Sequence, residues 1–276
     1  AGMIYNAVLD TKAATQSQVL IALERVQSSN ARAINYRYKQ LGAGLKRDLS
    51  ALDHVPDTDE LSTLVYSYDG FQQRVLQDSY ARIADEVLPL ITGDNALLKE
   101  SHAVLERKAE DDIQPNLDTE LYKLRIMDYI RRQTGVHITR IDSTTLEQVQ
   151  RLMATTSTTQ DFQTAIDDYF RHDWPTRSYT IARTESHSAA MTSVDTSVHL
   201  TQVDRPKRKT WRVTYVNTRS THMAMNGVEV DDTALFEVPR ADGGIDYMAY
   251  PGDSSHGAGA GNVINCRCHV GYRYAD

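Results

Sequence analysis

Apolar residues recur at intervals of three, four and seven along the first fifty residues, with charged residues between them. They are Val8, Leu9, Val19, Leu20, Leu23, Val26, Ile34, Leu41, Leu45, Leu49 and Leu52. This spacing places the apolar side chains on one face of an α-helix. It predicts a long amphipathic helix that reaches Leu52 and is broken near Gly42 and Gly44.

Three more helices are predicted before residue 135, because the same pattern recurs and is followed each time by a helix-ending residue. They cover 60–88, ended by Pro89 and Gly93; 95–113, ended by Pro115; and 117–134, with Gly135 just past the last turn. The short spacers between them are typical of antiparallel helix packing. The chain therefore begins as a helical bundle.

The pattern then changes from helical periodicity to alternation. Residues 136–141 alternate apolar with polar side chains and predict a short strand. Thr144 and Glu147 have the spacing of a capping box, which predicts a helix that opens there and runs toward Met153. Another helix is predicted over 159–171, before Trp174 and Pro175.

Beyond Pro175 a helix over 179–198 is followed by short strand patterns separated by turns. The strands are predicted at 211–216, 228–230 and 270–274, and Asn226-Gly227 indicates a hairpin. Trp211 and Tyr215 lie on the same side of the first strand and are expected in the core. The predicted fold class is α+β: an elongated, mostly helical region over 1–175 and a small α+β domain with a short antiparallel sheet over 176–276.

The formal charge of −7 resides in the helical region. Residues 1–175 hold 19 of the 30 basic and 26 of the 37 acidic residues, so the two signs balance in the remainder. The chain as a whole is therefore not expected to bind polyanions by net charge. No run approaches the roughly 20 apolar residues of a membrane helix, and residues 1–10 lack the pattern of a signal peptide. We expect a soluble protein without a membrane partner, and the two cysteines suit a reducing cytoplasm.

Both cysteines, Cys266 and Cys268, lie in the segment Asn-Cys-Arg-Cys near the end of the chain. Neighbours of this kind on a strand point the same way, which disfavours a disulfide that needs converging Cβ atoms. One hypothesis is a structural Zn²⁺ held by Cys266, Cys268, His222 and a fourth ligand, for which His269, His256 and Asp253 are the candidates. The alternative is a pair of buried, reduced thiols.

Two charged groups of the C-terminal domain are further candidates. Arg183 and Glu185 point to different faces of their predicted helix, whereas Arg183 and His187 share one. We predict a buried polar network in which Glu185 or Arg183 fixes the loop that carries Arg219 or Arg267 through a bidentate bond; the alternative is a solvated helix face.

A dense basic run precedes the predicted strand at 211–216. It contains Arg205, Lys207, Arg208 and Lys209 and is expected in an exposed loop. The run could contact DNA or an acidic partner, or could simply be solvated.

Several short motifs of the last hundred residues occur in one order. They are Ile181-Ala182-Arg183-Thr184-Glu185, Trp211, Asn217-Thr218-Arg219 with His222, Asn226-Gly227, Tyr250-Pro251-Gly252-Asp253 and Asn265-Cys266-Arg267-Cys268. This succession, over 176–276, resembles the C-terminal domain of the minor head proteins of tailed bacteriophages typified by the F protein of phage Mu. One departure is Asn217, where that family usually has Asp.

The resemblance implies a minor capsid, or head morphogenesis, protein without enzymatic activity. Such a protein is present at low copy number in the capsid interior near the portal, and resides in the host cytoplasm during assembly. The expected partners are the portal protein, the major capsid protein and packaged double-stranded DNA. The amphipathic helices would dock on the portal or the inner shell.

Two other classes of function stay open. The first is a thiol- or metal-dependent enzyme carried in the head, such as a protease that pairs Cys266 with His222 or His269, or a transferase-like effector. Against it, the sequence lacks His-Glu-x-x-His, Gly-x-Ser-x-Gly and phosphate-loop motifs. The second is a cytoplasmic scaffold that uses only the helices.

Overall fold

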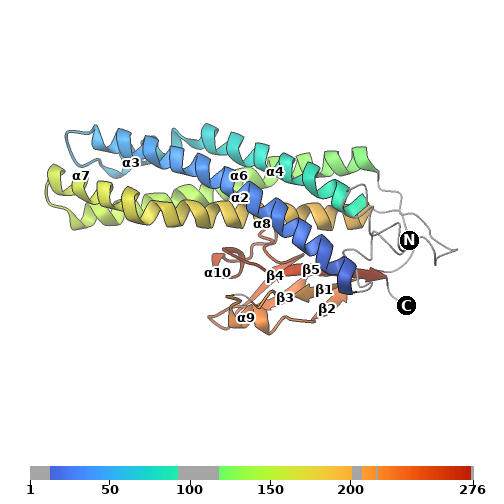
Figure 1. Ribbon diagram of the computed structural model, residues 1–276. Coiled ribbons are helices and arrows are strands. Elements are labelled where there is room, and N and C mark those ends of the chain that lie inside the picture. The colour runs from blue at the N-terminus through green and yellow to red at the C-terminus, as the bar shows by residue number, and fades with distance from the viewer. Residues whose placement is uncertain (1–12, 93–117, 201–206, 216, 275–276) are drawn as a thin grey trace.

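Long helices form an elongated bundle, and a small β region lies against one side of it (Figure 1). The computed structural model describes residues 13–92, 118–200, 207–215 and 217–274. The bundle contains α2 (Ala13–Ser50), α3 (Thr58–Tyr66), α4 (Asp69–Thr92), α6 (Thr119–Thr155), α7 (Thr159–Asp168), the π-helical turn η1 (Tyr169–Asp173) and α8 (Trp174–Leu200). The α+β class with a helical N-terminal region is confirmed.

The β region consists of two small antiparallel sheets. The strands are β1 (Lys207–Arg212), β2 (Glu229–Asp231), β3 (Phe236–Pro239), β4 (Ile245–Met248) and β5 (His269–Tyr274). β1 is the middle strand of the order β2-β1-β5, and β3 pairs with β4. The short helices α9 (Ser220–Met223) and α10 (Ala260–Val263) lie in the connections.

Side chains that accept backbone hydrogen bonds define several helix starts. Asp57 accepts from the amides of Asp59 and Glu60 at α3, Asp118 from Leu121 at α6, and Thr158 from Asp161 at α7. Each satisfies amide groups that have no partner within the helix. Asp, Asn, Ser and Thr are the usual residues at this position, so these starts follow from local sequence.

The predicted break of the first helix is wrong, because α2 continues through both glycines. A Cβ on Gly42 would lie 2.1 Å from Nε1 of Trp174, and one on Gly44 would lie 2.6 Å from the hydroxyl of Tyr68. The Trp174 indole donates to the carbonyl of Tyr38, at 2.9 Å. These glycines permit close approach of neighbouring aromatic side chains rather than ending the helix.

The strand predicted at 136–141 is also wrong, since α6 runs without interruption from Thr119 to Thr155. Its buried positions include Thr134, His137, Ile138, Ile141 and Thr145, which have helical spacing. Gly135 therefore lies inside the helix. The predicted capping box of Thr144 and Glu147 lies inside it too.

Two other predicted helices have different bounds in the structure. The helix predicted over 60–88 is two helices, α3 and α4, and α4 continues past Pro89 to Thr92. The helix expected to stop at Trp174 instead continues through η1 directly into α8, and Pro175 is the second residue of α8. The helix predicted over 95–113 lies outside the described residues.

The core is divided between the two ends of the bundle. One apolar cluster joins α4, α6 and α8 to the sheets and includes Ile83, Tyr122, Met191, Trp211 and Phe236. The other fills the far end of the bundle between α2, α3, α4, α6, α7 and α8. α8 contributes to both clusters, so the β region shares its core with the bundle. Tyr215, predicted in the core beside Trp211, is 67% exposed.

The remaining strand predictions are shifted or incomplete. The strand predicted at 211–216 is β1, which ends at Arg212, and β3 and β4 were not predicted. Asn226-Gly227 does not form a two-residue hairpin, because α9 lies between the paired strands β1 and β2. Among the described residues, every helix is too short or too polar to cross a lipid bilayer.

Candidate metal centre

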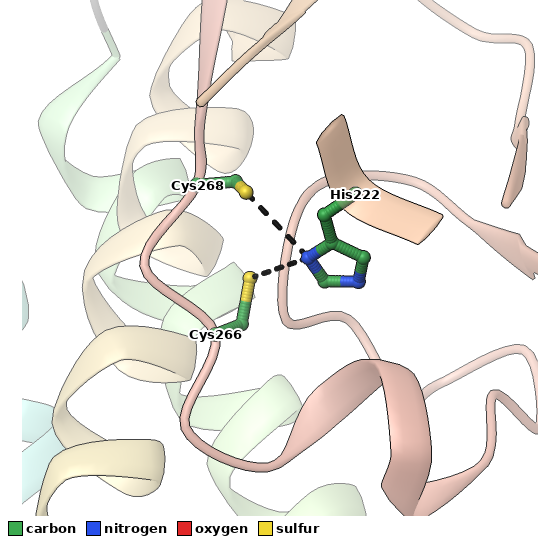
Figure 2. Close-up of side chains that lie close together, drawn as sticks. All are labelled: His222, Cys266 and Cys268. Carbon is green, nitrogen blue, oxygen red and sulfur yellow. Dashed lines mark hydrogen bonds between the residues drawn. The ribbon is translucent and has the colours of Figure 1, made fainter. Parts of the chain in front are cut away.

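The side chains of His222, Cys266 and Cys268 converge on one point (Figure 2). His222 comes from α9, and the cysteines come from the segment between α10 and β5. Nδ1 of His222 lies 3.6 Å from Sγ of Cys266 and 3.5 Å from Sγ of Cys268. All three ligand atoms lie within 4.8 Å of one another.

These separations fit a tetrahedral metal ion. With Zn–S and Zn–N bonds of about 2.3 and 2.0 Å, tetrahedral angles place sulfur and nitrogen about 3.5 Å apart. The donor set of two thiolates and one imidazole is also one that Zn²⁺ prefers. Both sulfur–nitrogen separations are therefore close to those of a zinc site.

Hydrogen bonds from neighbouring elements fix the segment that carries the cysteines. Asn265 has a positive φ of 57° and turns the chain just before Cys266. Its amide donates to Oγ1 of Thr184 in α8, at 3.0 Å. The guanidinium of Arg219 donates to the carbonyl of Ile264, at 2.5 Å. The two thiols are thereby held against α8 on one side and α9 on the other.

The centre is buried and chemically asymmetric. His222, Cys266 and Cys268 are 1%, 2% and 1% exposed, and both thiols are free. Hydrogen bonding to Cys266 and the nearby His222 lower the pKa of Cys268 to about 5. Hydrogen bonding to Cys268 and burial raise the pKa of Cys266 well above its usual value. One thiolate is thus favoured at neutral pH, and a bound cation would favour the second.

The candidate fourth ligands lie elsewhere. His269 lines a pocket together with Arg183 and His187, and burial followed by the nearby Arg212 lower its pKa to about 4. His256 contacts Asp253, whose carboxylate also accepts from the amides of Ala249 and Ser255. Within the described part of the chain, a metal ion here would have three protein ligands.

His222 is held in place by Trp211, whose ring meets the imidazole edge to face with centroids 5.2 Å apart. Trp211 is fully buried. The other ring nitrogen of His222, Nε2, is buried and has no hydrogen-bond partner among the described residues. This leaves Nδ1 as the atom directed at the two sulfurs.

The predicted network around Glu185 has different members. Glu185 accepts from the hydroxyl of Tyr80 at 2.9 Å and pairs with Nδ1 of His137, whose Nε2 lies 3.2 Å from the hydroxyl of Ser254. Burial lowers the pKa of His137, but the Glu185 carboxylate outweighs it and the net shift is upward. Glu185 therefore links α8 to α4 and α6, and not to Arg219 or Arg267.

Arg183 lies apart from Glu185, as their two-residue spacing predicted. It lines the same pocket as Arg267 and His187. His187 lies with Nε2 3.1 Å from the carbonyl of Pro251, and burial lowers its pKa to about 4. Sequence reasoning missed His137 because the segment around it was assigned to a strand.

The basic run is not an exposed loop. Lys207, Arg208 and Lys209 belong to β1. Lys209 is 1% exposed, and its amino group lies 5.5 Å from the centre of the Phe236 ring. Arg208 pairs with Glu229 and Asp231, and Lys207 donates to the carbonyl of Val198. Arg205 lies outside the described residues.

No protein-family model, curated protein or solved structure matches this chain.

Proposed function

We propose that the protein is a minor capsid, or head morphogenesis, protein of a tailed bacteriophage. The observation that carries the proposal is the ordered set of motifs within 176–276 that resembles the minor head proteins. It is incorporated at low copy number inside the head near the portal, where it assists assembly. Its partners are the portal protein and the major capsid protein, and it contributes to DNA packaging or ejection.

The positions of the motif residues support a structural role. Trp211, His222 and the cysteine pair Cys266 and Cys268 come from three separate motifs and form one buried cluster. Thr184, from another motif, accepts the hydrogen bond of Asn265. Residues that pack against one another in a core stabilise a fold, whereas catalytic residues need access to substrate. The motifs thus coincide with the contacts that hold the β region together.

The cofactor that we propose is one structural Zn²⁺ ion bound by His222, Cys266 and Cys268. A small region with short strands has little core of its own and gains stability from a metal ion that joins distant segments. Here the ion would join α9 to the segment before β5. The ion would thereby hold these two motif segments against each other.

A metal- or thiol-dependent enzyme is the second candidate, and one observation favours it. Three protein ligands with an open fourth position are typical of catalytic zinc sites. The burial of all three residues favours the structural role instead.

The function is tested in purified, DNA-filled heads of the phage that encodes the chain. We expect mass spectrometry to detect a few copies per head, resistant to added protease until the heads are opened, because the protein lies inside the shell. Absence of the chain from heads, or its digestion in intact heads, would contradict the proposal.

Variants separate the assembly role from the enzymatic one. Cys266→Ser should prevent incorporation into heads because it impairs folding, whereas the matched change His256→Gln, outside the centre, should not. An enzyme would give the opposite pattern, in which Cys266→Ser protein is incorporated normally but has lost turnover.

A further inference from the structure

A pocket of about 550 Å³ lies between α2, α8 and the start of β5. It is distinct from the point on which the metal ligands converge, although Cys268 contributes to its wall. Its size is within the range of pockets that bind small molecules, roughly 300 to 1,000 Å³. The helices α2 and α8 and the strand β5 that surround it can be followed in Figure 1.

The charged groups of the pocket are mainly cationic. Arg32 comes from α2, Arg183 from α8 and Arg267 from the segment before β5, whereas Glu24 is the one acidic residue of the lining. Within the described ranges, none of these three arginines forms an ion pair or a side-chain hydrogen bond. Guanidinium groups brought together from three elements without carboxylate partners repel one another, unless an anion lies between them.

Two buried polar atoms of the pocket residues also lack partners. Nε of Arg183 and Oγ1 of Thr214 are inaccessible to solvent and have no hydrogen-bond partner among the described residues. A buried donor without a partner costs about 1 to 3 kcal/mol, and more when it is charged. Both atoms can donate to an oxygen atom supplied from outside the chain.

We propose that this pocket binds a phosphate group, either as free phosphate or as the phosphate of a small phosphorylated molecule. The three arginines outnumber Glu24 and the Cys268 thiolate of the wall, so the lining keeps a net positive charge that suits a phosphate anion. Arginine binds phosphate oxygens through paired N–H donors. The exposed ring of Tyr179 and the side chain of Leu23 also line the pocket and provide a surface for an organic substituent. This site does not depend on the proposed role in the head.

Inorganic phosphate and a nucleoside monophosphate are the probes, measured by thermal unfolding and calorimetry on the full chain at constant ionic strength. We expect a saturable rise in melting temperature with phosphate and none with acetate. If the monophosphate binds more tightly than phosphate, the substituent contacts the pocket; equal affinity identifies phosphate alone as the ligand. Equal stabilisation by acetate, or no effect of either phosphate, would overturn the proposal.

Arginine variants locate the binding to the pocket. Arg183→Met should weaken phosphate binding by at least about tenfold, as expected for loss of a charge-assisted hydrogen bond. Arg32→Met should also weaken it, and this exposed residue can be replaced with little risk to folding. Arg151→Met, on an exposed part of α6 outside the pocket, should bind like the parent. Unchanged affinity in folded Arg183→Met and Arg32→Met protein would refute the assignment.

Discussion

Cys266 and Cys268 are two residues apart in sequence, and both side chains point to the same side of the chain, toward Nδ1 of His222. This geometry suits a shared metal ion, because both sulfurs lie at the distance from the imidazole nitrogen that tetrahedral zinc requires. The proposed ion can therefore be tested by removing a single ligand.

Cys268→Ser should reduce zinc from about one ion per chain to well below one and lower the melting temperature by several degrees, because metal binding contributes directly to folding. His269→Gln is the matched control: it alters the adjacent residue and should keep the zinc. Metal analysis and thermal unfolding, on protein purified without chelator, are the measurements.

Acid should release the same ion. Protons compete with metal for thiolates and imidazole. The hydrogen bond with Cys268 and burial raise the pKa of Cys266, so Cys266 takes up a proton first and zinc affinity should fall progressively as the pH is lowered from neutral. A structural metal would be ruled out if the protein purified without chelator contained almost no zinc and if added chelator left its melting temperature unchanged.

At the scale of elements, the two glycines of α2 differ from the glycine of α6. Gly42 faces the indole of Trp174, where an added Cβ has no room. Gly135 is exposed inside α6, and a Cβ there meets nothing within 4 Å. Gly42 is therefore a position where side chains pack closely, and Gly135 is not.

Gly42→Ala should lower the free energy of unfolding by about 1 to 3 kcal/mol, because overpacking a buried helix contact outweighs the better helix propensity of Ala. Gly135→Ala should raise it by about 0.5 to 1 kcal/mol, since only propensity changes. Urea unfolding of both variants is the comparison, and stabilisation by Gly42→Ala would contradict the packing role.

Errors in the predicted elements share a physical cause. Residues 136–141 alternate in polarity over six positions, which is too short a window to distinguish a strand from a helix turn. The buried residues Thr134, His137, Ile138 and Ile141 have helical spacing. Their burial results from packing against α4 and α8, however, and so cannot be predicted from this segment alone. Pro89 and Gly42 do not end their helices for the same reason, because tertiary packing overrides the low helix propensity of proline and glycine.

At the scale of the whole molecule, the division at residue 175 falls in the first turn of α8. This helix packs on α2 and α4, and its residues Ala190, Met191 and Val194 belong to the cluster that includes Trp211 and Phe236. Glu185 adds a buried contact with Tyr80 and His137. The β region is thus attached to the bundle through shared core residues.

A fragment of residues 176–276 should therefore not unfold cooperatively on its own, because α8 would expose the face that α2, α4 and α6 cover. The full chain should unfold in a single transition. Circular dichroism and calorimetry on both proteins provide the comparison; a fragment with a sharp transition and the zinc content of the full chain would show that 176–276 is an independent domain.

The sequence by itself determined the α+β class, the long amphipathic helices and the candidate thiol ligands, because these depend on local periodicity and on residue chemistry. Only the tertiary structure decided that His222, named with the cysteines from the sequence, meets them without His269 or His256. It also decided that Glu185 pairs with His137 and that Lys209 is buried. Each of these depends on contacts between segments far apart in the chain. No local pattern encodes such a contact, since it exists only once the bundle and the sheet have packed together.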